Sequence, residues 1–168
     1  MKFCHFLRNA SLASLRLLLA VWVGAAVLFV ITSVAEQTAP EFESVTRDQL
    51  ATIRFPLYYA FGSGIYGLSA LALSILWCCG EPHPRRRTVI TTTLICVSAL
   101  VFAYDYFMVY RPLQQLIIPP GSVRNEHFMT LHKASEYANT IHVLLMLIAA
   151  AVVSWPRPPA AKADPESA

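Results

Sequence analysis

Four long apolar blocks dominate this sequence and limit what the chain can fold into. They cover about residues 17–35, 55–79, 89–110 and 137–155, and Asp105 is the one Asp, Glu, Lys or Arg within them. A helix needs about 20 apolar residues to cross a hydrocarbon core of roughly 30 Å. Helix is also the form expected in lipid, because each backbone N–H and C=O must be satisfied within its own segment. The blocks therefore predict four transmembrane helices.

The composition agrees with a membrane protein and argues against a soluble enzyme. Of the 168 residues, 56% are hydrophobic and 14% are charged, whereas soluble domains carry about 25% charged residues. The net charge of +3 is small and lies in short loops and tails, so nucleic-acid binding has no support. We expect an all-α bundle of four transmembrane helices in antiparallel up-down order, with an N-terminal flank at 1–16. The Pro- and Ala-rich segment 156–168 is expected to be a disordered cytoplasmic tail.

The distribution of Lys and Arg predicts the orientation, because cytoplasmic loops carry an excess of these residues. Eight of the 13 lie in the N-terminal flank, the second loop and the tail, and five lie in the first and third loops. Both termini are therefore expected in the cytoplasm, at the inner (plasma) membrane if the source is bacterial. The first block ends in Ser33-Val34-Ala35, as a cleavable signal peptide could, but it exceeds the ~7 to 15 apolar residues typical of one.

Aromatic and proline residues near the block ends refine this prediction. Trp and Tyr prefer the membrane interface, so we expect interfacial rings at Tyr58, Tyr59, Tyr106 and Tyr110 on the outer side and at Trp77 and Trp155 on the inner side. Pro56 is expected in the first turn of the second membrane helix, where a proline costs no hydrogen bond. Pro119-Pro120-Gly121 interrupts the third loop, and no further Pro or Gly follows until Pro156. The last helix should therefore begin outside the membrane.

Small residues form a stripe along the second block. Ala60, Gly64, Gly67 and Leu71 fall on one helical face, and small side chains let membrane helices approach closely. We expect a packing seam here. Such a face would also permit a homo-oligomer or contact with another membrane protein, in addition to the lipid bilayer.

Asp105 is the polar residue that is most costly to place in the membrane. An Asp at a helix centre costs about 2.5 to 3.5 kcal/mol on insertion scales, so it should face protein and have a partner. Heptad spacing aligns it with Thr91, Ser98 and Pro112. We expect this row to face inward, with Asp105 held by Arg54, a tyrosine or a histidine.

A second group of polar residues opens the last helix. These residues lie at offsets of three, four, seven and ten from His132 and so share one helical face. With the second helix they predict a polar cluster at the outer end of the bundle, in which His142 alone lies deeper. The candidate site residues are Arg54, Tyr58, Asp105, His132, Ser135, Glu136, Asn139 and His142.

Three interpretations of this cluster remain open. It can be structural, made of interhelical hydrogen bonds. It can be a metal site, in which Asp105, His132 and Glu136 would be the ligands. It can also be a passage for a proton or a small polar solute. Nothing in the sequence resembles a phosphate loop, a nucleophile elbow or a catalytic triad, so no catalytic residue and no cofactor is predicted.

Several short motifs resemble the family named after transmembrane protein 205, a domain-of-unknown-function family of four-span membrane proteins. The motifs are Trp22-Val23-Gly24, Arg54-Phe55-Pro56-Leu57-Tyr58-Tyr59, Tyr110-Arg111-Pro112, and Phe128-Met129-Thr130-Leu131-His132-Lys133-Ala134-Ser135 with Asn139. The likeness covers about residues 15–155. It implies four spans and no particular reaction.

The family's recurrent polar positions would correspond here to Arg54, Pro56, Tyr58, Pro112, His132, Ser135 and Asn139. Asp105 departs from the family pattern, where a neutral or amide residue is expected. A weaker similarity links the Trp-x-Gly of the first block to bacterial copper-resistance membrane proteins. We therefore expect a non-enzymatic integral membrane protein of undefined biochemical role. The alternative is a small-solute or proton transporter, or a metal-handling membrane protein.

Overall fold

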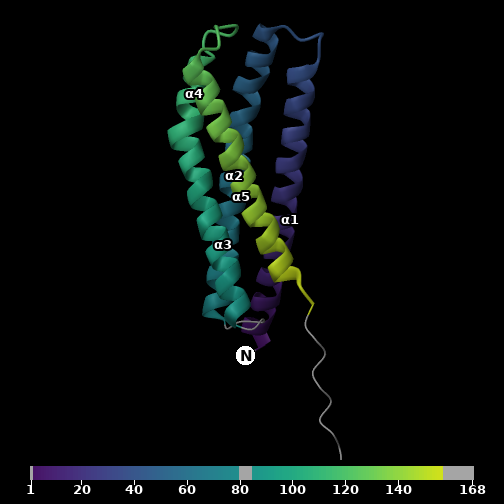
Figure 1. Ribbon diagram of the computed structural model, residues 1–168. Coiled ribbons are helices and arrows are strands. Elements are labelled where there is room, and N and C mark those ends of the chain that lie inside the picture. Colours follow the sequence, from purple (N-terminus) through teal and green to yellow (C-terminus); the bar gives the residue numbers. More distant parts are fainter. Residues whose placement is uncertain (1, 80–84, 157–168) are drawn as a thin grey trace, which may run out of the picture.

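The chain is built of long helices in the computed structural model, which describes residues 2–79 and 85–156. Figure 1 shows them side by side as an elongated bundle. No strand occurs in these two ranges. The predicted tail lies outside the described residues except for its first residue. The helices are α1 (Lys2–Thr38), α2 (Ser44–Cys78), α3 (Arg85–Tyr104), the π-helical segment η1 (Asp105–Tyr110), α4 (Arg111–Leu116) and α5 (Glu126–Ser154).

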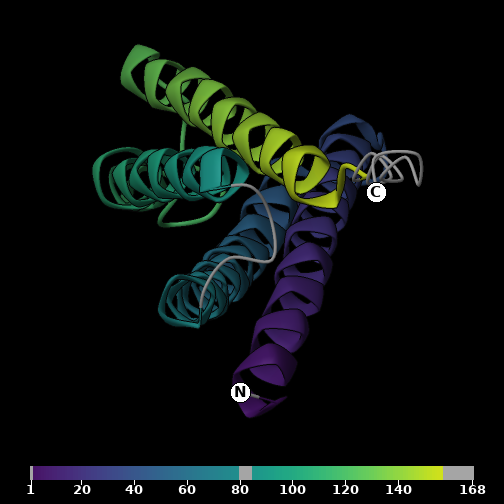
Figure 2. The ribbon, with the colours of Figure 1, turned by 90° about the horizontal axis from the view of Figure 1, so that it is seen from below.

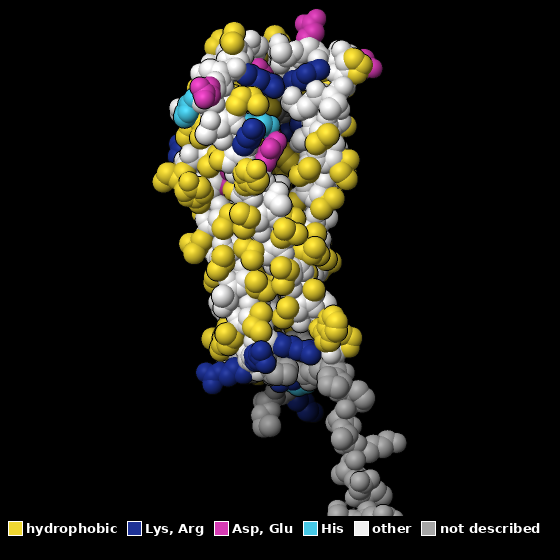
Figure 3. Space-filling model, viewed as in Figure 1, with side chains coloured by type: hydrophobic (Ala, Val, Ile, Leu, Met, Phe, Trp, Pro, Cys, Tyr) yellow, Lys and Arg dark blue, Asp and Glu magenta, His cyan; other side chains and the backbone are white. Residues whose placement is uncertain are grey.

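Four helical stretches are long and apolar enough to cross a membrane. They are α1, α2, α5 and the continuous stretch Arg85–Leu116, which joins α3, η1 and α4. An all-α architecture with four candidate membrane spans is therefore confirmed. All four stretches begin before the predicted membrane spans, and α1, α2 and α5 begin at Lys2, Ser44 and Glu126. Figure 3 shows a band of hydrophobic side chains between two ends at which charged side chains gather.

The helices pack in an uneven ring. The main contacts join α1 to α2 and α3 to α5, while α5 also packs on α1 and the backbones of α2 and α3 make few contacts. The oblique course of α5 is visible in Figures 1 and 2 and brings its last turns to α1. There Arg16 Nε donates a hydrogen bond of 3.1 Å to the carbonyl oxygen of Val153. The space between α2 and α3 is bridged by aromatic side chains, such as Tyr66 and Phe102, whose ring centroids are 5.1 Å apart.

Trp22 lies at the centre of the core and is fully buried. Its ring packs against those of Tyr58, Phe102 and His142 at centroid distances of 5.0, 5.7 and 5.9 Å. Gly62 of α2 makes room for this cluster. A Cβ at that position would lie 2.6 Å from Trp22 Cη2 and 2.7 Å from Phe102 Cζ, so only glycine fits. The bulky rings of Trp22 and Phe102 therefore require the smallest residue at this position of α2.

The predicted small-residue seam on α2 is wrong for the single chain. No described residue would lie within 4 Å of a Cβ added at Gly64 or Gly67, and Ala60 and Leu71 are exposed. The inward face is the one that carries Gly62. Since α2 is apolar all round, the spacing of small residues alone does not identify the face that packs.

Two other predictions about helix ends are corrected. Tyr58, Tyr59 and Tyr110 are buried in the bundle and are not interfacial rings, because polar partners for the first two lie inside. Pro56 lies in the interior of α2 and not in a first turn, because that helix already begins at Ser44. The early start of the last helix is confirmed. There the Asn125 side chain caps α5 by accepting a hydrogen bond of 2.8 Å from the Phe128 backbone N–H.

Candidate functional site

The π-helical segment η1 places a carboxyl group inside the bundle. It begins at Asp105, which is 1% exposed, and Thr91 and Ser98 are buried on the same face. The predicted inward row is confirmed for these three residues and wrong for Pro112. A π turn holds one residue more than an α turn, so the row continues at the buried Leu113 and not at Pro112, which is half-buried. Such segments are frequent at functional sites, and this one starts at the acid.

Tyr59 of α2 holds one of the two carboxyl oxygens of Asp105. Tyr59 Oη donates a hydrogen bond of 2.6 Å to Asp105 Oδ2, and Ser135 of α5 lies close enough to interact with both side chains. The other oxygen, Oδ1, is buried and has no hydrogen-bond partner among the described residues. A tyrosine was among the expected partners, but Tyr59 itself was missed, since nothing in the sequence distinguishes it from Tyr58.

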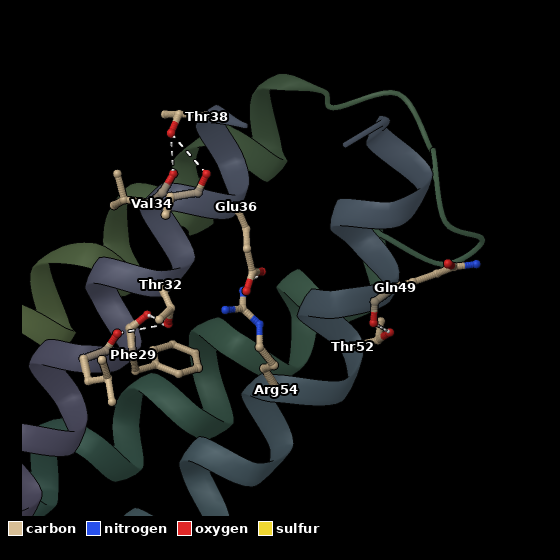
Figure 4. Close-up of polar contacts among 10 residues, drawn as sticks. Phe29, Thr32, Val34, Glu36, Thr38, Gln49, Thr52 and Arg54 are labelled. Atoms are coloured by element: carbon tan, nitrogen blue, oxygen red, sulfur yellow. Dashed lines mark hydrogen bonds and ion pairs between the residues drawn. The ribbon is translucent and has the colours of Figure 1, made fainter. Parts of the chain in front are cut away.

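Arg54 is not the partner of Asp105. Its Nη2 lies 2.6 Å from Glu36 Oε2, and its guanidinium sits 5.6 Å from the ring centroid of Phe29. Figure 4 shows Arg54 of α2 and Glu36 of α1 pointing toward each other across the gap between the helices. Glu36 was missed because the first loop was expected to begin there, whereas α1 continues to Thr38.

A pocket of about 260 Å³ opens beside Asp105, at the end of the bundle where α4 lies. We call it the α4-end pocket. Six of the eight predicted site residues line it, and its other walls come chiefly from α1 and α2. The lining residues are Phe29, Val30, Ser33, Val34, Gln37, Thr38, Phe55, Tyr58, Tyr59, Asp105, Leu113, His132, Ser135, Glu136 and Asn139. Apart from Arg54 and His142, the residues of the predicted polar cluster therefore surround a pocket.

The helical face predicted on α5 forms one wall of this pocket. Asn139 Oδ1 accepts a hydrogen bond of 2.5 Å from Tyr58 Oη, which joins α5 to α2. Glu136 lies one turn before Asn139 and His132 two turns before it. Their side chains form a largely exposed pair, with His132 Nε2 3.2 Å from Glu136 Oε1. His142, in contrast, is fully buried below the pocket, and its ring stacks on Trp22. It does not line the α4-end pocket.

A smaller pocket of about 110 Å³ adjoins the first and contains Arg54. It shares five lining residues with the α4-end pocket, among them Ser33 and His132. Its buried acid is Asp48, whose Oδ2 accepts a hydrogen bond of 2.8 Å from the Gly121 backbone N–H. Asp48 Oδ1 also lies 3.3 Å from Arg124 Nη2. These contacts fasten the segment after α4 to α2. Asp48 was missed because it was assigned to a surface loop.

No metal centre is formed in the part of the chain that the structure describes. Residues 2–79 and 85–156 contain no group of three or more His, Cys, Asp or Glu side chains placed to hold one ion. The suggested ligands divide instead into a His132–Glu136 pair and an Asp105 that is bound by Tyr59. This geometry does not favour a metal-handling function.

The chemistry that remains is that of a small binding site. The α4-end pocket combines aromatic walls with a buried carboxyl group, a carboxamide and a hydroxyl from three helices. Arg54, Pro56 and Pro112, which the family resemblance also singled out, lie on the helices around it. Comparisons with protein-family models, with curated proteins and with solved structures found no match for this chain.

Proposed function

We propose that this chain is a non-enzymatic, multi-pass membrane protein that binds a small molecule in the α4-end pocket. The unpaired oxygen of Asp105 is the observation that carries this proposal. A buried acid in a membrane helix is costly, and such residues normally mark a functional site. An acid with a purely structural role would be expected to have both oxygens paired. Here Oδ1 has no partner among the described residues and Asp105 lines the pocket.

We further propose an antiparallel up-down order with both termini in the cytoplasm. Two contacts support the opposite directions of the first two helices. Glu36 near the end of α1 pairs with Arg54 near the start of α2, while Cys4 Sγ at the start of α1 lies 3.5 Å from the carbonyl oxygen of Cys79 just after α2. With the Lys and Arg distribution, this order puts the α4-end pocket on the outer side.

We also propose that α1 is retained in the mature protein and is not cleaved as a signal peptide. It supplies Trp22 to the centre of the core and Leu15 and Leu19 beside it, all fully buried. It also supplies Phe29 and Ser33 to the pocket wall. Cleavage after Ala35 would remove all of these side chains.

A second candidate function is the passage of a proton or small solute along the bundle. A buried polar row supports it. Tyr66 Oη and Ser98 Oγ share a hydrogen bond of 2.6 Å, and Ser98 Oγ donates a hydrogen bond of 2.9 Å to the carbonyl oxygen of His142. Thr91 continues the row away from Asp105. Flux into sealed proteoliposomes distinguishes this function from binding alone.

Filling the pocket tests the proposed binding function. Ser33 lines both pockets, so Ser33→Leu should occupy the space where a ligand would lie. Thr32→Leu is the matched control, because Thr32 is exposed and its hydroxyl bonds only to backbone carbonyls of its own helix. We expect wild type and Thr32→Leu to carry a co-purifying small molecule in native mass spectrometry, or to be stabilised by members of a small-molecule panel. Ser33→Leu should lose both properties, and equal behaviour of all three proteins would contradict the proposal.

A further inference from the structure

We infer that the ligand of the α4-end pocket carries a cationic ammonium group on a small apolar body. This inference rests on the binding function proposed above. Among the described residues, two acidic side chains, Asp105 and Glu136, line the pocket, and no Lys or Arg does. His132, its remaining ionisable basic group, already pairs with Glu136. The charge of the lining therefore favours a cation.

Asp105 supplies a pre-positioned acceptor for that cation. Tyr59 fixes one carboxyl oxygen by a hydrogen bond of 2.6 Å, which leaves Oδ1 without a partner. Because Asp105 is almost fully buried, its charged form is costly without a nearby cation. An ammonium N–H or an N-methyl group beside Oδ1 would stabilise that charged form. The nearby guanidinium groups form ion pairs with other acids: Arg54 Nη2 with Glu36, and Arg124 Nη2 with Asp48.

The rest of the lining suits an organic cation better than an inorganic one. Phe29, Phe55, Tyr58 and Tyr59 are in the walls, and aromatic rings attract ammonium groups electrostatically. A metal ion needs several ligands that converge on one point, and the described residues contain no group of three or more His, Cys, Asp or Glu side chains placed to hold one. A volume of about 260 Å³ lies just below the range of roughly 300 to 1,000 Å³ typical of ligand pockets. The ligand should therefore be smaller than most drugs.

Binding of benzyltrimethylammonium to the protein in an ammonium-free maltoside detergent tests this inference. The neutral comparison is its carbon isostere neopentylbenzene, which has the same shape without the charge. Titration calorimetry should detect the cation and show at least about tenfold weaker binding of the isostere. A short-chain phosphatidylcholine, added separately, tells whether a lipid headgroup or a free amine is the better source of the ammonium group.

Matched variants of the two buried acids locate the effect. Asp105→Asn keeps an acceptor for Tyr59 but removes the charge, and we expect at least about tenfold weaker cation binding with no change for the isostere. Asp48→Asn is the control, because Asp48 is also buried at this end but holds Gly121 and Arg124 outside the α4-end pocket. It should bind the cation as wild type does.

Each outcome bears on the inference. Equal binding of the cation and its isostere to wild type would overturn the ammonium assignment and leave the proposed binding function in place, and this comparison needs no variant to fold. If cation, isostere and phosphatidylcholine all fail to bind, both the inference and the proposed function lose their support. Binding that survives in Asp105→Asn but not in Asp48→Asn would assign the cation to the adjoining pocket and overturn the site.

Discussion

The two halves of this bundle fill the space between four helices in opposite ways. Around Trp22 the interior is packed so closely that Gly62 cannot be exchanged for a larger residue without a clash. Two turns further along α1, beside Asp105, a pocket of about 260 Å³ remains. Tyr58 belongs to both halves, since its ring contacts Trp22 and also lines the pocket. The packed half therefore supports the side chains that line the pocket and fixes their positions.

Truncation of Trp22 should have the largest effect on stability. Trp22→Ala removes ring contacts to Tyr58, Phe102 and His142, and such core truncations cost about 3 to 5 kcal/mol. Unfolding by titration with a denaturing detergent measures the loss. Trp77→Ala is the control, because Trp77 is exposed near the opposite end. Equal losses in the two variants would contradict a packed half centred on Trp22.

Gly62→Ala should have the next largest effect. The added methyl group would lie under 3 Å from Trp22 and Phe102, and overpacking typically costs about 1 to 3 kcal/mol. Gly64→Ala adds the same group where nothing lies within 4 Å, so its unfolding free energy should stay within about 0.5 kcal/mol of wild type. A clear loss in Gly64→Ala would instead indicate that this outer face packs against a second copy or another protein.

Tyr59→Phe probes the pocket half with a smaller change. It removes the hydrogen bond to Asp105, and such bonds between membrane helices contribute about 0.6 kcal/mol on average and up to about 1.7 kcal/mol. A double-mutant cycle with Asp105→Leu should recover this coupling. Tyr104→Phe serves as the control, because Tyr104 is exposed. Strictly additive losses would mean that the two side chains do not interact in the folded protein.

The Arg54–Glu36 pair should contribute least. Both side chains are about one fifth exposed. Because desolvation offsets much of the attraction in a partly buried ion pair, we expect a net contribution of roughly 0 to 1 kcal/mol. Arg54→Gln, Glu36→Gln and the double variant should show a small coupling that falls as salt is added. A coupling that is large and independent of salt would show that the pocket half is as dry and as tightly packed as the half around Trp22.

The sequence predicted those parts of the site that follow from helical periodicity. Thr91, Ser98 and Asp105 share a buried face as their heptad spacing indicated. His132, Ser135 and Asn139 line one pocket as their offsets indicated. Both predictions depend only on residues within a few turns of one regular helix.

The features that were missed depend on irregular geometry or on distant partners. The π turn at Asp105 shifts the inward face from Pro112 to Leu113. The spacing of residues in the sequence does not predict such a turn. Glu36 pairs with Arg54 because α1 continues beyond its apolar stretch to Thr38. Gly62 is needed because of Trp22 and Phe102, which lie on two other helices. Hydropathy carries none of this information.

Cysteine accessibility tests the contrast between the two halves most directly. The native cysteines Cys4, Cys78, Cys79 and Cys96 would first be replaced by serine, and single cysteines then introduced as Ser135→Cys in the pocket wall or Ser98→Cys in the packed row. A charged, water-soluble thiosulfonate is added to the protein in detergent. We predict that Ser135→Cys reacts quickly, that benzyltrimethylammonium slows this reaction, and that Ser98→Cys stays unmodified. An unreactive Ser135→Cys, or equal reaction at both positions, would contradict a pocket in one half of the bundle and a closed core in the other.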